Sequence, residues 1–583
     1  MLPLTNVKGV YMKRISIFAI LSLALAILPA APAGGQTTHN LEIIWQKAKP
    51  ETSVYWQGWG FAMASGDLNG DGYSDFVTAL DSSLNEPWIR YMVKIYIFNG
   101  GLTLSTIPSQ TIIYDSLGNY PSFCIADFNK DGYGDLAIGD SRGVGVNSEK
   151  GQVNIHYGTG FDLNPKPDLV IDGYGSATAT NFGQALSAGD INGDGVDDLI
   201  IGAPDYGELN ARGRVYIYFG DTSGVDDWPD IILNGHTEAG YYENFGNSMD
   251  GTMDYNKDGY NDLIIGAYLN AKTGNAAGKI YYYISKGEQI DTIADGWIYG
   301  EASYQRLAAY NVSSVPADTN GFASVGWFGT PDWPSTTGSF DRGKCYMVPG
   351  DTMGEITPLW AMTGNDLSDS ALGYWSCSAG YADNDKLGDK LASALLAFGD
   401  PGKVYLWLRR ATMRQQPDAY IIGRASTPGG DALGGKIATA ADVDGDVKGE
   451  FLVSNYFADT GNMIWLCKYT GPEGVAGRPA DSGQRPAFRL GQNYPNPFKT
   501  RTTINYQLTT NSSVNLSVYN IAGQLVKTLI NDNSVPLRIG EGRAGSITWD
   551  GRDNSNRAVS NGVYIYKLNM GGKSMAKKMT LIR

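Results

Sequence analysis

Short apolar runs separated by polar, glycine-rich loops recur along most of the chain. One unit contains the runs Leu199–Ala203, Gly213–Tyr218 and Pro229–Leu233, and similar runs return in the next unit at Leu263–Ala267 and Gly278–Tyr283. Runs of this length, rich in Val, Ile and Tyr and bounded by Gly or Pro, are typical of β-strands. A further apolar stretch precedes each polar loop, so each unit predicts four strands.

An acidic nonapeptide marks each of these units. Full copies begin at Asp67, Asp127, Asp190 and Asp254, at separations of 60, 63 and 64 residues. Weaker copies begin at positions 381 and 442, and a decayed copy near position 318 fills the gap, which gives seven units. Seven repeats of four strands predict an all-β fold, a seven-bladed β-propeller over residues 41–471.

The ends of this repeated region predict how the ring closes. The last unit has its third strand at Met463–Cys467 but no fourth strand after it, and a spare strand, Leu41–Trp45, precedes the first unit. Because an open sheet edge invites unwanted pairing, we expect the N-terminal strand to complete the seventh blade.

The acidic nonapeptides have the composition of a calcium loop. Calcium prefers six to eight hard oxygen ligands, and alternate residues of a tight loop can point such oxygens inward. Side chains at positions 1, 3, 5 and 9 and the carbonyl at position 7 would be the ligands, with Gly at position 6 to allow the turn. An EF-hand would need Glu at position 12, where this chain has Thr78, Ile138, Ile201 and Ile265. The candidate ligands of the four full loops are Asp67, Asn69, Asp71, Tyr73 and Asp75; Asp127, Asn129, Asp131, Tyr133 and Asp135; Asp190, Asn192, Asp194, Val196 and Asp198; and Asp254, Asn256, Asp258, Tyr260 and Asp262.

The weaker copies leave the number of ions open. The sixth loop keeps Asp383, Asp385 and Asp389 but has Tyr381 at its first position. The seventh keeps Asp442, Asp444, Asp446 and Glu450 but lacks the glycine at position 6, and the fifth is expected to bind nothing. We therefore predict about four to six structural Ca²⁺ ions, against the simpler alternative that Asp, Asn and Gly merely build turns here.

The phrases around the loops resemble a known repeat family. Phe182-Gly183 precedes the third loop and Gly202-Ala203-Pro204 follows it, as in the FG-GAP repeats of integrin α-subunit propellers. The resemblance covers about residues 41–471. It implies a propeller with calcium in its loops, and the third and fourth repeats match it best.

The two ends of the chain predict export. Lys13 and Arg14 precede an apolar run, Ile15–Leu28, and Ala31-Pro32-Ala33 offers a cleavage site, so residues 1–33 read as a secretory signal peptide with a start at Met12. No other long apolar run occurs, so we expect no transmembrane span. Residues 472–486 are rich in Pro, Gly and Ser and read as a linker.

A small β-sandwich is expected at residues 487–583. This segment carries a net charge of +9 whereas the rest of the chain carries −24, which indicates two separate units. Its phrases Gln492–Phe498, Trp549–Asp553, Asn561–Tyr566 and Lys577–Arg583 resemble type A C-terminal sorting domains of the type IX secretion system. The resemblance implies a Gram-negative host, contact with that secretion machinery through residues 487–583, and a location on the cell surface or in the medium. An ordinary adhesive immunoglobulin-like module is the alternative.

No catalytic constellation stands out in the sequence. Of the three histidines, we expect His39 to be disordered, His156 to lie in a strand and His236 in a loop. The four cysteines form no metal-binding pairs, and the acidic body is a poor match for nucleic acid. Aromatic side chains in the loops opposite the acidic ones are candidate ligand-binding anchors, although they can also pack between blades: Trp88, Tyr206, Tyr241, Trp327 and Trp333.

These features favour an exported, calcium-stabilised binding or adhesion protein whose ligand is an extracellular polysaccharide or protein. The alternative is an exported polysaccharide-active enzyme, a lyase or hydrolase. A lyase would need a basic residue near a pocket for an acidic sugar, and no such arrangement is visible in the sequence.

Overall fold

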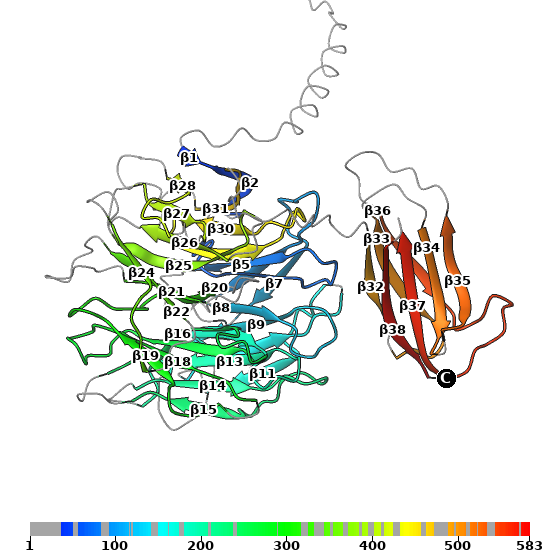
Figure 1. Cartoon of the computed structure of the whole chain (residues 1–583), viewed down its shortest axis with the longest axis horizontal. Helices are drawn as coiled ribbons and strands as arrows, with labels where there is room; N and C mark the ends of the chain where they lie inside the picture. The colour runs from blue at the N-terminus through cyan, green and yellow to red at the C-terminus, as the bar shows by residue number, and fades with distance from the viewer. Residues whose placement is uncertain are drawn as a thin grey trace, which may run out of the picture.

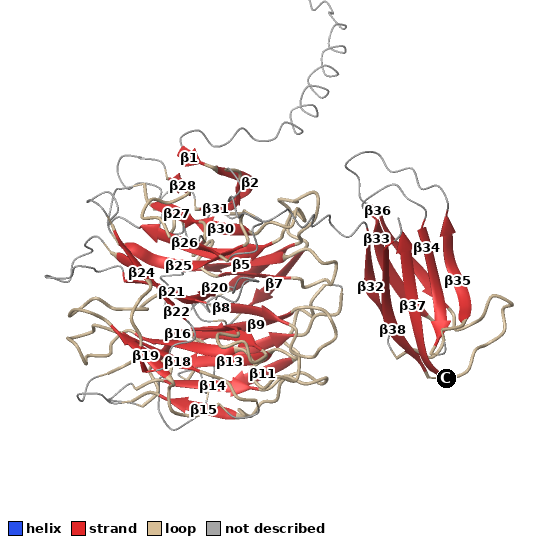
Figure 2. Ribbon diagram, in the orientation of Figure 1, coloured by secondary structure: helices blue, strands red, loops and turns tan. Residues whose placement is uncertain are grey.

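The computed structural model describes most of the chain from residue 37 onward. The described residues are 37–50, 56–82, 92–115, 117, 121–141, 150–160, 162–173, 180–207, 212–236, 242–287, 290–315, 325–330, 343–349, 354–364, 371–383, 388–394, 401–409, 413–423, 432–455, 462–471, 488–494, 497–508, 514–521, 523–532, 543–570 and 573–582. Within them every regular element is a β-strand, and no helix occurs (Figure 2). The predicted signal peptide and linker lie outside the described residues.

Seven sheets of four or five strands are built from residues 37–469, antiparallel throughout except for the parallel pair of β19 and β23 (Figure 1). The first three blades follow the chain in order. Blade 1 contains β3 (Trp56–Gln57), β4 (Met63–Gly66), β5 (Asp75–Ser82), β6 (Val93–Phe98) and β7 (Gln110–Tyr114); blade 2 contains β8 (Ser122–Ala126), β9 (Asp135–Asp140), β10 (Gln152–His156) and β11 (Leu169–Asp172); blade 3 contains β12 (Ala185–Gly189), β13 (Asp198–Ala203), β14 (Arg214–Tyr218) and β15 (Ile231–Asn234).

Three of the remaining four blades, 4, 6 and 7, include a strand from elsewhere in the chain. Blade 4 contains β16 (Phe245–Met253), β17 (Asp262–Ala267), β18 (Lys279–Tyr283), β19 (Gly296–Tyr299) and β23 (Gly354–Glu355); blade 5 contains β20 (Val312–Val315), β21 (Val325–Thr330), β22 (Lys344–Pro349) and β24 (Trp360–Thr363); blade 6 contains β25 (Leu372–Gly380), β26 (Asp389–Ala394), β27 (Lys403–Trp407), β28 (Ala419–Ile422) and β1 (Thr37–His39); blade 7 contains β29 (Lys436–Ala441), β30 (Glu450–Ser454), β31 (Met463–Tyr469) and β2 (Leu41–Ala48).

The inner strands of the blades form a closed ring. Each of β4, β8, β12, β16, β20, β25 and β29 contacts the next, and β29 contacts β4. Strand β2 pairs antiparallel with β31, with Leu41 opposite Tyr469 and Ala48 opposite Met463. The N-terminal strand thus completes the last blade, as the sequence predicts. A β-propeller of antiparallel blades is therefore the fold of this region.

Packing between blades explains the apolar runs of the sequence. The second strand of blade 3, β13, is buried along its whole length because a neighbouring blade covers each of its faces. One core cluster joins Val153 and Ile155 of blade 2 to Leu199 and Ile201 of blade 3. A strand that is covered on both faces reads as a continuous apolar run rather than an alternating one.

The C-terminal region forms two further sheets. One contains β32 (Phe488–Tyr494), β33 (Thr502–Leu508) and β36 (Arg543–Trp549); the other contains β35 (Leu525–Asp532), β34 (Val514–Asn520), β37 (Gly562–Met570) and β38 (Lys573–Leu581). Ile504 and Trp549 of the first sheet share one buried core with Leu516 and Tyr566 of the second. Two sheets around one core make a small β-sandwich.

Candidate metal loops and central cavity

The acidic nonapeptides lie between the first and second strands of their blades. The four complete loops span residues 67–75, 127–135, 190–198 and 254–262, and each follows the end of an inner strand. Because all inner strands run in the same direction through the ring, these loops gather at one end of it. We call this end the metal-loop face.

Side-chain oxygens of each loop accept hydrogen bonds from the loop's own backbone. In the first loop, Asp67 Oδ2 accepts from the Gly72 N–H at 2.7 Å, Asn69 Oδ1 from the Asp71 N–H at 2.8 Å, and Asp71 Oδ1 from the Tyr73 N–H at 2.9 Å. The other three complete loops repeat these bonds. Gly72 has φ +86°, a conformation that favours glycine, which explains the residue at position 6.

The carboxylate at position 9 ties each loop to the third strand of its blade. Asp75 accepts from the Leu68 N–H at 3.0 Å with Oδ2 and from the Gly100 N–H at 2.9 Å with Oδ1. Burial raises the pKa of Asp75, Asp198 and Asp262 to about 7 and that of Asp135 to about 8. A cation beside these buried carboxylates would favour their charged form.

Neighbouring loops are bonded to one another around the ring. The Gly134 N–H donates to the Asp67 carbonyl at 2.7 Å, and the Asn261 N–H donates to the Asp190 carbonyl at 2.8 Å. Equivalent bonds join loop 3 to loop 2, loop 1 to loop 7, and loop 7 to loop 6. The acidic loops therefore form a belt that joins blades 6, 7, 1, 2, 3 and 4 in succession.

A second contact between loops depends on which residues stand at positions 4 and 7. The ring of Tyr133 lies over Gly70 of the preceding loop, so close that a Cβ on Gly70 would stand 2.6 Å from it. Tyr260 covers Gly193 and Tyr73 covers Gly445 in the same way. Where position 4 is Lys130, the next loop has the smaller Val196, and the lysine ammonium donates to the Asp194 carbonyl at 2.8 Å. Gly at position 4 thus goes with Tyr at position 7 of the next loop, and Lys at position 4 goes with Val. This correspondence is visible in the sequence but was not among the predictions made from it.

The weaker loops differ from the complete ones. In the seventh, oxygens of Asp442, Asp444 and Glu450 lie within 4.8 Å of one another, a spacing that could hold a metal ion. The Lys468 ammonium lies 2.6 Å from Asp444 Oδ2 and also pairs with Asp446. In the sixth loop, Asp383 and Asp389 are buried, and Asp385 lies outside the described residues together with the decayed fifth copy.

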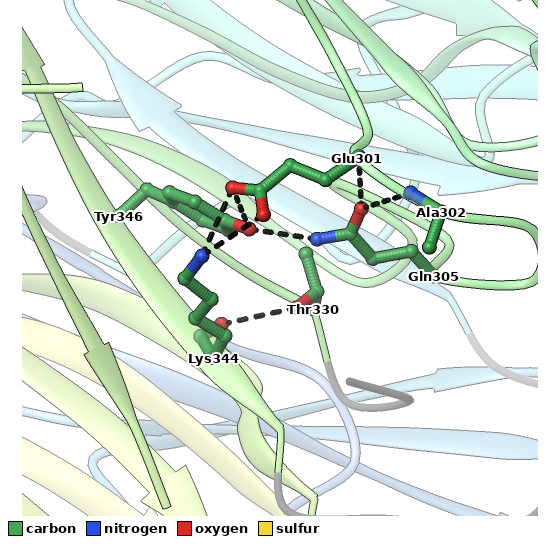
Figure 3. Close-up of polar contacts among 6 residues, drawn as sticks. All are labelled: Glu301, Ala302, Gln305, Thr330, Lys344 and Tyr346. Atoms are coloured by element: carbon green, nitrogen blue, oxygen red, sulfur yellow. Dashed lines mark hydrogen bonds and ion pairs between the residues drawn. The ribbon is translucent and has the colours of Figure 1, made fainter. Parts of the chain in front are cut away.

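Two polar clusters lie at the opposite end of the ring. Glu301, which follows blade 4, pairs with Lys344 of blade 5 at 2.9 Å and accepts from the Tyr346 hydroxyl at 3.0 Å (Figure 3). Glu243, before blade 4, accepts from the hydroxyl of Tyr281 and, at 3.2 Å, from Asn270. Burial raises the pKa of Glu243 to about 7.

The inner strands enclose a central cavity of about 730 Å³. Tyr310 and Tyr374 stack in its wall with ring centroids 4.3 Å apart, and the Lys436 ammonium lies 3.6 Å from the ring centre of Trp375. These residues are at the beginnings of inner strands, so they line the end of the cavity away from the metal-loop face. Among the described residues that line the cavity, Lys436 is the one cation.

Of the five predicted ligand-binding aromatics, Tyr206 is the one whose side chain is described. Trp88, Tyr241 and Trp333 lie outside the described residues, as does the side chain of Trp327, whose backbone belongs to β21 rather than to a loop. Tyr206 is described, and the Arg214 guanidinium lies 3.7 Å from its ring centre. Its partner is therefore a neighbouring cation, and it does not line the cavity.

Two of the histidines have structural roles. His39 is ordered, contrary to expectation, because β1 pairs with β28 and the His39 ring stacks on Tyr420 at 5.2 Å. His156 is fully buried in β10, with Nε2 2.5 Å from the Tyr114 hydroxyl. The four cysteines are free thiols. No helix among the described residues is long and apolar enough to cross a membrane.

Comparison with known proteins agrees with the repeats. Models of the FG-GAP repeat match residues 182–218 and 245–283, and a model of the FG-GAP-like repeat matches residues 67–138. Integrin alpha-V of Gallus gallus is 34% identical over 36% of this chain and 20% of its own length. Integrin alpha-5 of Xenopus laevis is 29% identical over 43% of this chain and 23% of its own length.

A relative of another kind also matches this region. Phosphatidylinositol-glycan-specific phospholipase D of Homo sapiens is 31% identical over 36% of this chain and 26% of its own length. The chain thus spans only about a fifth to a quarter of the length of these relatives. At the other end, a model of the secretion system C-terminal sorting domain matches residues 492–545. The chain therefore carries integrin α-like FG-GAP repeats in its propeller and a secretion system sorting domain at its C-terminal end.

Proposed function

We propose that this protein is an exported binding protein of a Gram-negative bacterium, stabilised by calcium and delivered by the type IX secretion system. The sorting domain that matches residues 492–545 supports this route. A sorting domain has no use in a protein that stays inside the cell. Export would deliver the propeller to the outer surface or the medium, where calcium is available to loops of modest affinity.

The four complete loops would hold the ions. Their donors are carboxylate, amide and carbonyl oxygens, which is the ligand type that calcium prefers. The buried carboxylates at position 9 support this assignment, because a bound cation would offset the cost of burying their charge. Calcium supplies positive charge and rigidity here, and it stabilises the folded state because the unfolded chain lacks the assembled loops.

We place the ligand-binding region at the end of the central cavity away from the metal-loop face. The observation that carries this is the meeting of Lys436 with three aromatic residues, Tyr310, Tyr374 and Trp375, in a cavity of about 730 Å³. Asp250 also lines the cavity, but its oxygens accept from the N–H groups of Ser314 and Thr252. Lys436 therefore favours an acidic saccharide, whose carboxylate would face the ammonium while the sugar ring lies against an aromatic side chain.

The test is binding of the full-length protein to polygalacturonate, with cellulose as the neutral comparison. We expect retention on polygalacturonate that Lys436→Gln reduces about tenfold, a change of about 1.4 kcal/mol. Lys166→Gln, at an exposed site outside the cavity, is the matched control and should bind as the parent does. Equal binding by the two variants would contradict the placement of the site.

The same experiment examines the alternative function. Release of unsaturated uronate, measured by its ultraviolet absorbance, would favour a lyase over a binding protein. Retention without product would favour binding.

A further inference from the structure

We infer that the seventh acidic loop is a cation site of its own kind, in which Lys468 holds the affinity for calcium below that of the four complete loops. This inference rests on the proposed binding of calcium to those four loops. It concerns a residue that lies outside the nonapeptide and reaches the loop from the third strand of the blade.

The seventh loop keeps the turn of the complete loops despite its altered sequence. Val447 N–H donates to Asp442 Oδ2 at 3.1 Å, Asp446 N–H to Asp444 Oδ1 at 3.0 Å, and Val443 N–H to Glu450 Oε2 at 2.8 Å. These bonds correspond to those of the first loop. Val447 adopts φ +79° where the complete loops have Gly, a conformation that a β-branched residue rarely adopts. The same backbone frame is therefore retained in this loop.

The loop differs in having carboxylate oxygens that no described protein group satisfies. Glu450 is fully buried, and its Oε1 has no hydrogen-bond partner among the described residues; the same holds for Asp442 Oδ1. In the complete loops the second oxygen of the position-9 Asp accepts an N–H from the end of the third strand. Buried oxygens without a donor, within 4.8 Å of a third carboxylate, point to a cation as the missing partner.

Lys468 supplies part of that positive charge from within the protein. Its ammonium lies 2.6 Å from Asp444 Oδ2 and also contacts Asp446 Oδ2. The register of β30 and β31 places Lys468 beside Glu450, the position-9 residue of this loop. In the complete loops, the residue beside the position-9 Asp is uncharged: Asn99, Tyr157, Phe219 and Ile284.

The seventh loop has one more carboxylate among its ligand positions than a complete loop has. Positions 1, 3, 5 and 9 carry four carboxylates in the seventh loop, because Asp444 replaces the Asn of position 3, against three in each complete loop. Lys468 offsets the extra carboxylate, so these four positions together with Lys468 carry the same charge as the four positions of a complete loop. An incoming calcium ion would have to share Asp444 and Asp446 with the ammonium, and like charges at such short range repel strongly. Calcium affinity at this loop should therefore be lower than elsewhere.

The experiment is a calcium titration of the full-length protein by calorimetry, with Lys468→Met as the main variant. We expect the parent to bind four ions in a tighter class and a further ion in a weaker class. Lys468→Met should tighten the weaker class at least tenfold and leave the tighter class unchanged. Lys47→Met, which removes a lysine from strand β2 of the same blade, is the matched control and should titrate as the parent does.

A second variant assigns the weak ion to this loop. Glu450→Gln keeps an acceptor for the Val443 N–H but removes the charge, so it should abolish the weak class and leave four ions. If the weak class survives in Glu450→Gln, or is unchanged in Lys468→Met, the inference is wrong while the four tight ions still support the proposed function. If the parent binds no calcium at all, the proposed function fails as well.

Discussion

Blades 1–4 and blades 5–7 differ in their acidic loops and in the strands that form their sheets. In blades 1–4 every acidic loop is complete, and blades 2–4 each donate a backbone hydrogen bond to the loop before them. In blades 5–7 the loops are altered, and strands from the N-terminal end of the chain join two of these sheets, β1 in blade 6 and β2 in blade 7. The comparison indicates that the acidic loops join blades as well as offering metal ligands. In blades 6 and 7, pairing with N-terminal strands adds to the loop contacts that still join blades 6, 7 and 1.

The largest effect should follow from removing calcium. A ligand at 100 times its dissociation constant stabilises the folded state by about 2.7 kcal/mol per site. With several sites, we expect chelation to lower the melting temperature by about 10 °C or more. Thermal unfolding in excess chelator and in calcium measures this effect. An equal melting temperature in both would show that blades 1–4 need no metal.

A pH-dependent loss of stability should follow from Glu243. Burial raises the pKa of Glu243 to about 7 from 4.5, so the folded protein holds a proton that the unfolded chain releases. The free energy of unfolding therefore falls as pH rises from about 4.5 to 7, by about 3 kcal/mol from this group. Glu243→Gln should remove that part of the difference between melts at pH 5 and pH 8 in saturating calcium.

The next cluster along the ring supplies the control for Glu243. The control is Glu301→Gln, which removes a carboxylate that is 45% exposed and pairs directly with Lys344. If both variants change the slope equally, the buried position of Glu243 is not the cause.

The contact between loops can be separated from the turn it accompanies. Gly70 and Gly132 have φ of +71° and +88°, so alanine at either position incurs the backbone cost of about 1–2 kcal/mol. Only at Gly70 would the new Cβ meet Tyr133, because nothing lies within 4 Å at Gly132. Gly70→Ala should therefore destabilise the protein by about 1–3 kcal/mol more than Gly132→Ala, measured by denaturant unfolding. Equal losses of unfolding free energy in the two variants would show that the contact between Tyr133 and Gly70 does not contribute to stability.

The smallest effect should come from a single ligand in one complete loop. Asp131→Asn keeps an acceptor for the Tyr133 N–H but removes one charged ligand, so we expect calcium affinity in that loop to fall about tenfold. The melting temperature in chelator should stay close to that of the parent. Asp172→Asn, at the exposed end of β11, makes the same charge change outside the acidic belt and should leave the titration unaltered.

The repeats made much of the propeller predictable from sequence. The acidic loops, the strands around them and the closure of blade 7 by Leu41–Ala48 follow from residues that recur at nearly constant spacing. Strands β1 and β23 were not predicted, because Thr37–His39 and Gly354–Glu355 are short and polar and gain their strand character only from the partner they meet.

The same limit applied to the candidate sites. Lys468 lies 24 residues from Asp444 in sequence, and strand register alone brings the two together. Lys436 likewise meets Trp375 only because the inner strands of blades 6 and 7, β25 and β29, are neighbours in the ring. The aromatic residues singled out from the sequence were chosen for their side chains and expected loops, but position around a ring is a property of the assembled blades.

The last strand of blade 7 determines the face of the ring from which the chain leaves the propeller. Strand β31 runs toward the acidic loop of its own blade, since Lys468, one residue before the end of β31, contacts Asp444. The chain that continues from residue 471 therefore departs from the metal-loop face. Any tether made beyond that point would hold the ring by its metal-loop face. The cavity end with Lys436 and Trp375 would then face away from the tether, where a ligand in the surrounding medium can reach it.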